Sequence, residues 1–251
     1  MHVPYQRSLL APDRPLILIL GASRGIGMCM TQDLVKLGGH VMIVSRDFLA
    51  MQELREKYPN QVDFVFTDLA LPAAPRLVIE ATIQRWGKID GLVINHSVLS
   101  PMTRVENGDI EDWMHVFNTN FFSAAMICKY AIPHLRKVKG RIIFVSSHAT
   151  QDTYSAWGPY SASKAALEQL SKTIAAEEPR IKCVSISPGP VKTMMYDEIR
   201  SHQGDQMDPQ ARETLNEKLQ TGQFLTPAQV GGVIMRLSIW ATQEMSGQHF
   251  R

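Results

Sequence analysis

The segment LILILGASRGIG, residues 16–27, joins a short apolar run to a turn that contains three glycines. A run of that length suits a buried parallel strand, and residues 28–37 continue with helical spacing. Glycines let backbone N–H groups approach a pyrophosphate, and the dipole of the following helix favours its charge. The GxxxGxG spacing would also suit a tight turn that only packs a helix against a strand. The strand, the turn and the helix together predict a dinucleotide site.

Strand-like and helical segments alternate along the rest of the chain, which is typical of a parallel sheet with helices on both faces. Strands are expected near residues 16–20, 40–45, 62–67, 91–95, 140–146, 182–187 and 247–250, and helices notably at 72–86, 113–136 and 159–178. This alternation predicts a single α/β domain over residues 15–251, a doubly wound parallel sheet, after an arm at residues 1–14. The polar segment 194–223 is expected to cover a ligand, although a solvated helical pair would have the same composition.

Tyr160 and Lys164 lie four residues apart in a segment that is expected to be helical, so they share one helix face. A lysine placed there would lower the pKa of the phenol through its charge and fit it for proton transfer. The pair alone is common on helix surfaces. Ser147 and Asn120 upstream, together with the glycine turn, make a catalytic interpretation stronger.

These motifs stand in the order found in short-chain dehydrogenases/reductases. They are GASRGIG, Asn95, Asn120, Ser147, the Tyr160/Lys164 pair and the SPGPVKT segment at residues 187–193. The chain resembles that family from residue 15 to about residue 250, and the WGPY and SKAAL segments at 157–160 and 163–167 are similar to members of the sepiapterin and benzil reductase type. The resemblance implies a Rossmann fold of about seven strands and an NADP-dependent oxidoreductase acting on ketones or alcohols.

The resemblance also implies catalytic roles. Tyr160 would donate the proton, Lys164 would bind the nicotinamide ribose, and Ser147 would hold the substrate oxygen. Ser146 competes with Ser147, and because adjacent strand residues face opposite ways, only one of them can serve. Asn120 resembles the asparagine that holds a water in the proton relay, with Asn118 as the nearby alternative.

Charge at the end of the second expected strand favours NADPH over NADH. An NAD-binding chain usually carries a carboxylate there, whereas this chain has Ser45 and Arg46, and Arg24 lies in the glycine turn. Two guanidinium groups would pair with a 2′-phosphate. Asp47 would weaken this preference if it faced the ribose, but one position later it is better placed to begin a helix.

Other cofactor contacts follow from the resemblance. Asp68 would bind the adenine, although a turn or cap aspartate is an equal reading, and Thr193 would contact the carboxamide. The family's small residues after Asn95 are replaced by His96 and Ser97, so His96 either faces the substrate or packs as a hydrogen-bonded histidine. The remaining predicted cofactor residues are Gly21, Ser23, Gly25, Ile26, Gly27, Leu69, Pro188, Gly189 and Val191.

The predicted substrate wall is rich in aromatic and thioether side chains, which suits a bulky, flat or hydrophobic ketone. Several of these side chains would also fit a purely packing role under the lid. The wall comprises His96, His148, Tyr154, Trp157, Pro190, Met194, Met195 and Tyr196.

Composition restricts the other possibilities. The 251 residues are 45% hydrophobic, which is enough for one sizeable core, and a net charge of +2 without a basic tract argues against nucleic acid or membrane partners. Three widely spaced cysteines predict reduced thiols and a cytoplasmic location. No histidine motif suggests a metal, and residues 1–15 resemble neither a signal peptide nor a membrane anchor.

Family members usually form homodimers or homotetramers through two helices, which correspond here to residues 113–136 and 159–178, and alanines in both would permit close approach. Two other functions remain open. The chain would be an NADP-binding regulatory protein if it bound cofactor without turnover. It would catalyse a non-redox step of secondary metabolism if the altered wall at residues 95–97 served a different chemistry.

Overall fold

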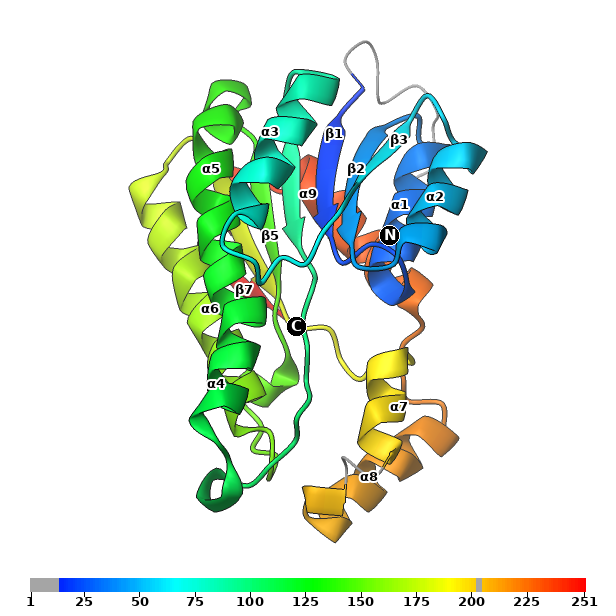
Figure 1. Ribbon diagram of the computed structural model, residues 1–251, viewed down its shortest axis with the longest axis vertical. Helices are drawn as coiled ribbons and strands as arrows, with labels where there is room; N and C mark the ends of the chain where they lie inside the picture. The colour runs from blue at the N-terminus through cyan, green and yellow to red at the C-terminus, as the bar shows by residue number, and fades with distance from the viewer. Residues whose placement is uncertain (1–13, 202–204) are drawn as a thin grey trace.

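The core of the protein is a parallel sheet of seven strands in the order β3-β2-β1-β4-β5-β6-β7. The computed structural model describes residues 14–201 and 205–251, so nearly all of the expected N-terminal arm lies outside the described residues (Figure 1). The strands are β1 Leu16–Leu20, β2 His40–Ser45, β3 Val62–Phe66, β4 Gly91–Ile94, β5 Arg141–Val145, β6 Lys182–Ile186 and β7 His249–Phe250. The predicted α/β doubly wound Rossmann fold is confirmed.

The helices cover the two faces of the sheet. In Figure 1 the helices α3, α5 and α6 lie on one side and α1, α2 and α9 on the other. Their bounds, with those of the helices outside these layers, are α1 Gly25–Lys36, α2 Phe48–Lys57, α3 Ala74–Trp86, α4 Ile110–Phe117, α5 Ser123–Val138, α6 Gly158–Glu177, α7 Met194–Arg200, α8 Pro209–Gln220 and α9 Pro227–Trp240. Short 3₁₀ turns occur at Val105–Asn107, His148–Thr150 and Gln243–Met245.

Alternate residues of each central strand enter two separate cores, because successive strand side chains point to opposite faces. Leu18 and Leu20 pack with α3, α5 and α6, whereas Ile17 and Ile19 pack with α1 and α9. All five residues of β1 are fully buried, as the unbroken apolar run predicted. The strand order reverses between β1 and β4, and open α/β sheets bind ligands at such a point, beyond the carboxyl ends of the strands.

The helix expected at 113–136 is present, but it is not a regular α-helix throughout. A π-helical turn, Asn118–Phe122, separates α4 from α5. Within it Asn120 is fully buried and bonds to the backbone of Val98, with Nδ2 2.9 Å from the carbonyl and Oδ1 2.8 Å from the N–H. The asparagine thus connects this turn to the segment after β4, and π-turns in helices frequently mark functional positions.

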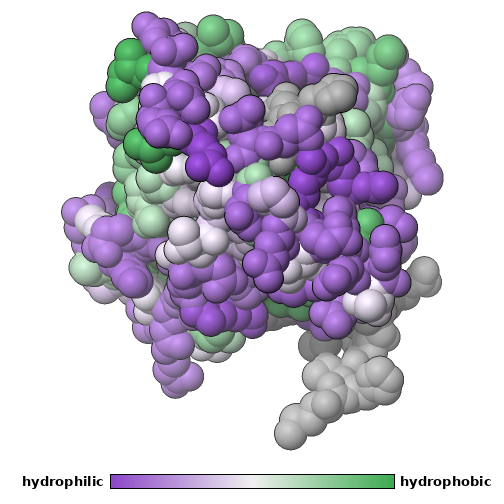
Figure 2. Space-filling view, turned by 90° about the horizontal axis from the view of Figure 1, so that it is seen from below, coloured by the Kyte–Doolittle hydropathy of each residue, from purple (hydrophilic) through white to green (hydrophobic). Residues whose placement is uncertain are grey.

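The segment after β6 forms two helices, α7 and α8, below the carboxyl edge of the sheet (Figure 1). Seen from below, the outer surface around them is mostly hydrophilic (Figure 2). Tyr196, Ile199 and Leu215 are buried instead, in an apolar cluster that also contains Trp157 and Tyr160. Within the described residues, no helix combines the length and apolar character that a bilayer crossing requires.

Candidate active site

A cavity of about 430 Å³ opens at the carboxyl edge of the sheet, between the strand ends and the α7–α8 segment. Its volume falls within the usual range of small-molecule pockets, about 300–1,000 Å³. Every predicted site residue lines this cavity except Gly27 and Asn120, which lie behind its wall. The cavity therefore joins the glycine turn, the Tyr160/Lys164 pair and the predicted substrate wall into one continuous site.

The glycine turn is shaped by close backbone contacts. Gly21 has φ of +75°, and a Cβ there would lie 2.8 Å from the Cα of His96. A Cβ on Gly27 would lie 2.3 Å from the carbonyl oxygen of Gly21, so Gly27 allows the turn to close from behind. The amide of Asn95 donates to that same carbonyl at 2.8 Å, which attaches the turn to the end of β4.

The turn leaves a helix N-terminus exposed to the cavity. Arg24 occupies the cap position of α1, and its side chain makes no capping hydrogen bond. The first N–H groups of a helix have no partner within the helix, and here no side chain takes them. A cradle that excludes Cβ atoms beside free N–H groups fits the pyrophosphate of a dinucleotide.

Two guanidinium groups border the adenosine end of this cradle. Arg46 is largely exposed and pairs with Asp68 at 3.6 Å, and Arg24 donates to the sulfur of Met194 at 3.3 Å. Asp47 caps α2 by accepting the N–H of Ala50 at 3.1 Å, as its position predicted. For Asp68 the sequence left open an adenine contact or a role in a turn. The structure is compatible with both, because Asp68 lines the cavity and also accepts the N–H of Ala70 at 2.9 Å.

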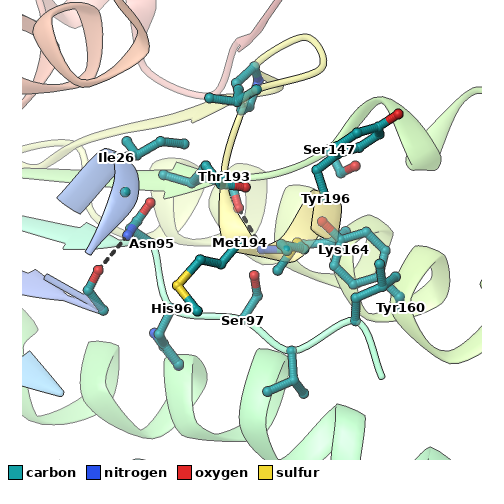
Figure 3. A pocket seen from close by; sticks show the side chains of 18 of the residues that line it. Ile26, Asn95, His96, Ser97, Ser147, Tyr160, Lys164, Thr193, Met194 and Tyr196 are labelled. Carbon is teal, nitrogen blue, oxygen red and sulfur yellow. Dashed lines mark hydrogen bonds between the residues drawn. The ribbon is translucent and has the colours of Figure 1, made fainter. Parts of the chain in front are cut away.

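Tyr160 and Lys164 project from α6 toward the end of β5, where Ser147 follows the strand (Figure 3). The ammonium nitrogen of Lys164 lies 5.8 Å from the centroid of the Tyr160 ring and donates to the carbonyl oxygen of Val145 at 2.8 Å. Lys164 is 1% exposed and Tyr160 6%. The helical spacing thus brings both groups to one wall of the cavity.

The pKa values of this pair correct one expectation. Burial raises the pKa of Tyr160, and a hydrogen bond with Ser147 opposes that rise. Burial also lowers the pKa of Lys164 to about 7, so at neutral pH its charge is partly lost. The expectation that the charge of Lys164 lowers the phenol's pKa is not met in this arrangement, because burial raises that pKa and Lys164 is not among the groups that shift it.

The two adjacent serines face opposite ways, as the strand geometry required. Ser146 donates to Oε1 of Glu168 at 2.5 Å, whereas Ser147 lines the cavity beside Tyr160 and opposes the effect of burial on the pKa of that phenol. Asn120 does not line the cavity. Its Nδ2 lies 3.0 Å from the hydroxyl of Ser163, one position before Lys164. Asn120 thus contacts α6, the helix that carries Tyr160 and Lys164, and its connection to the cavity is indirect.

His96 packs inside the wall. Its Nε2 lies 2.7 Å from the hydroxyl of Ser123, which itself donates to the carbonyl of Thr119, so Nε2 carries the proton. Burial lowers the pKa of His96 to about 3, and the ring is neutral. The histidine borders the cavity mainly through its backbone beside Gly21. His96 is therefore better described as a packed, hydrogen-bonded histidine than as a substrate contact.

The substrate end of the cavity is aromatic. Tyr154 stacks on Trp157 with ring centroids 4.6 Å apart, and Trp157 meets Tyr160 edge to face at 5.8 Å. Tyr196 of α7 meets Phe224 edge to face at 4.6 Å. Sequence reasoning missed several lining residues. Leu99, Thr119, Asp152 and Ile199 lie close to predicted residues in the sequence, whereas Leu215, Lys218 and Phe224 come from α8 and the segment after it.

The described residues hold no group of three or more His, Cys, Asp or Glu side chains placed to bind a metal ion. The cavity chemistry is instead that of a phenol, an ammonium group, a hydroxyl and a phosphate cradle. These groups suit proton transfer beside a bound dinucleotide.

Comparison with known proteins identifies the same family that the sequence motifs resemble. Residues 15–204 match the family model described as short chain dehydrogenase. The chain is 34% identical to an uncharacterised oxidoreductase of Schizosaccharomyces pombe, over 93% of this chain and 94% of that protein. It is 33% identical to benzil reductase ((S)-benzoin forming) of Saccharomyces cerevisiae, over 94% and 95%. The crystal structure of the KRED1-Pglu enzyme covers 94% of this chain and 99% of its own, with a TM-score of 0.91 and 31% identity.

Proposed function

Because this chain belongs to the short-chain dehydrogenase family, we propose that it is an NADPH-dependent carbonyl reductase acting on bulky hydrophobic or aromatic ketones. The family places it among oxidoreductases acting on CH–OH groups. One observation carries the proposal: Ser147, Tyr160 and Lys164 line the same aromatic cavity, with the ammonium nitrogen of Lys164 5.8 Å from the centroid of the Tyr160 ring. The similarity to a benzil reductase supports an aromatic ketone.

The protein's own groups divide the work of such a reduction. The glycine turn and the N-terminus of α1 would hold the pyrophosphate, and Lys164 and Thr193 would hold the nicotinamide end. The bound nicotinamide supplies the hydride to the carbonyl carbon. Ser147 would donate a hydrogen bond to the carbonyl oxygen and fix its position. Tyr160 would give that oxygen a proton, so the product is an alcohol and the phenol regains a proton from solvent.

The aromatic walls would orient the ketone. Trp157 is buried and Tyr154 half-buried, so a flat substrate group can replace water against their faces. Met195, at the start of α7, packs against the same aromatic cluster, and Met194 lines the cavity beside Arg24; thioethers adapt to substrates of different outline. We therefore expect α7 and α8 to act as the substrate lid and the specificity to be broad.

The reductase is tested with purified protein by following NADPH oxidation in the presence of aromatic diketones, quinones and simple aryl ketones. Turnover that depends on the ketone supports the proposal. Cofactor binding without turnover across the panel would favour a regulatory protein, and product formation without nicotinamide oxidation a non-redox step. The non-redox step was suggested by the altered residues 95–97. His96, one of these residues, is packed and neutral in the structure.

Arg46→Ala is expected to weaken NADPH binding about tenfold and to leave NADH binding within about twofold. A charge-assisted hydrogen bond to phosphate contributes about 1.5–3 kcal/mol, and NADH has no phosphate at that position. The dissociation constants are measured by nicotinamide fluorescence at one fixed salt concentration. Lys57→Ala is the control, because Lys57 is an exposed cation on α2 that does not line the cavity. Comparable catalytic efficiencies of the wild type with NADPH and NADH would contradict the cofactor assignment.

The proposed homo-oligomer would use the exposed apolar face of α4 and the π-turn. Ile110 is 66% exposed, Met114 55% and Phe122 51%, an unusual grouping for a surface in water. Met114→Glu combined with Phe122→Glu is expected to give monomers in size-exclusion chromatography with light scattering, because a dimer would bury those carboxylates. Leu49→Glu on α2, also at an exposed apolar residue, is the control. A wild-type monomer would overturn this assignment.

The three cysteines are free, and Cys128 and Cys183 are buried. Free thiols are typical of reducing compartments, so a cytoplasmic location stays part of the proposal.

A further inference from the structure

Helix α6 carries three polar side chains at intervals of one turn, and each contacts the end of β5. Tyr160, Lys164 and Glu168 are four residues apart, so they share one helix face. Lys164 donates to the carbonyl of Val145, and Glu168 accepts the hydroxyl proton of Ser146 at 2.5 Å. Val145 and Ser146 are therefore each held by one side chain of α6, and Ser147 lies beside the third, Tyr160.

The contact between Glu168 and Ser146 has a neighbour that plays no part in the proposed reaction. His249 on β7 places its Nδ1 3.6 Å from Oε1 of Glu168 and 2.9 Å from the hydroxyl of Ser185 on β6. The side chains of Glu168 and His249 are 14% and 13% exposed, so this contact is largely shielded from water. A carboxylate at such a site requires a hydrogen-bond donor, and the hydroxyl of Ser146 provides one, while the ring of His249 packs beside it beyond hydrogen-bond distance.

Glu168 does not line the cavity, but Ser146, to which it bonds, does. Ser146 and Ser147 share a peptide bond and point to opposite faces, and fixing the first hydroxyl fixes the peptide plane from which the second side chain extends. We propose that Glu168, which bonds to Ser146 and packs against His249 of the C-terminal strand, is a positioning residue that aims the Ser147 hydroxyl at Tyr160 and the substrate oxygen. This inference rests on the proposed function.

The test compares Glu168→Ala, Ser146→Ala and Glu168→Gln. Removal of either partner of the bond is expected to lower kcat about tenfold, because small misplacements of a reacting group cost up to about a hundredfold in rate. KM and the dissociation constant for NADPH should stay within about twofold, because the cofactor contacts are untouched. The amide oxygen of Glu168→Gln still accepts the proton of Ser146, so this variant should recover most of kcat.

A second readout does not depend on activity. The protein is labelled with ¹³Cζ-tyrosine, the Tyr160 signal is assigned with Tyr160→Phe, and its chemical shift at fixed pH reports the hydrogen bond from Ser147. Glu168→Ala should move that signal, and Glu168→Gln should restore it. Glu177→Gln is the matched control, because Glu177 is exposed near the end of the same helix.

The outcomes separate the two proposals. A moved Tyr160 signal in a protein whose wild type reduces no ketone would leave the positioning role standing and overturn the reductase. An active wild type, with kcat and the Tyr160 signal unchanged in Glu168→Ala, would overturn the positioning role. A variant with a lower melting temperature but wild-type kcat and an unmoved signal would show that Glu168 only pins the helix to the strand, which also contradicts it. If Glu168→Ala does not fold, Ser146→Ala decides by the same two readouts.

Discussion

Tyr160→Phe is expected to lower the turnover number for ketone reduction about a thousandfold. General acid catalysis by a positioned side chain typically contributes about 10²- to 10⁴-fold, and phenylalanine keeps the ring while removing the proton. Tyr160 is 6% exposed and lines the cavity together with Ser147 and Lys164. The measurement is kcat from NADPH oxidation at saturating ketone, with the melting temperature recorded for the same samples.

The variant should remain folded. Its lost hydrogen bond is worth about 1 kcal/mol, and the ring still packs edge to face against Trp157. The dissociation constant for NADPH should stay within about threefold. Tyr130→Phe on α5 is the control, because it removes a phenol outside the cavity. A loss of only severalfold in Tyr160→Phe would exclude Tyr160 as the acid and direct attention to a bound water.

Burial of Tyr160 also sets the direction of the pH dependence. Because burial raises the pKa of the phenol above its ordinary value of about 10, the group keeps its proton throughout neutral pH. It is therefore a ready donor for reduction. Oxidation of an alcohol needs the deprotonated form and should become faster as the pH rises. The environment of Tyr160 in the protein without cofactor thus favours the reductive direction.

The parts of the fold and site that the sequence predicted are those encoded by local patterns. The apolar run of β1, the glycines that follow it and the i, i+4 spacing of Tyr160 and Lys164 each depend on residues only a few positions apart. The folded chain therefore has them as the sequence predicted. Asp47 is of the same kind, because a helix cap depends on its own three neighbours. For such features the chain's local chemistry was sufficient.

The parts that could not be predicted depend on contacts between distant segments. The ring of His96 is held by Ser123, 27 residues away, and Glu168 lies against His249 on a strand that is separated from α6 in the sequence by β6 and the helices α7, α8 and α9. The break between α4 and α5 follows from the bonds of Asn120 to Val98, which no helical periodicity reveals. The pKa of Lys164 depends on how completely the folded chain excludes water, which one sequence cannot show.

Lys164→Met is expected to abolish most of the activity and, at acidic pH, to make the cofactor-free protein more stable. Lys164 would hold the nicotinamide ribose, so its loss should lower kcat/KM about a hundredfold through misplacement of the reacting groups. The pKa of the buried ammonium falls from 10.5 to about 7, and each pKa unit corresponds to about 1.4 kcal/mol. Burying this charge therefore costs roughly 5 kcal/mol wherever both the folded and the unfolded states are protonated, that is, below pH 7.

The sign of the effect changes with pH. Between pH 7 and 10.5 the unfolded chain binds the proton and the folded chain releases it, so the stability of the wild type rises with pH across this window. The methionine variant has no such rise. It also leaves the carbonyl of Val145 without its donor, which costs about 1–3 kcal/mol at every pH. The variant should thus be about 2–4 kcal/mol more stable than the wild type at pH 6 and less stable by about 1–3 kcal/mol at pH 10.5.

Urea denaturation of the cofactor-free proteins at pH 6, 8 and 10 measures this difference directly. Lys172→Met on the same helix is the control, because that lysine is exposed and its removal should change stability little at any of these pH values. A stability difference between Lys164→Met and the wild type that stays constant with pH would show that the ammonium keeps its ordinary pKa when folded. In that case Lys164 would enter catalysis fully charged, and the phenol would lie under the influence of a permanent cation after all. A difference that reverses sign would instead show that the site tolerates an unstable, partly neutral lysine in order to place it beside Tyr160, which is the usual exchange of stability for function at a buried active site.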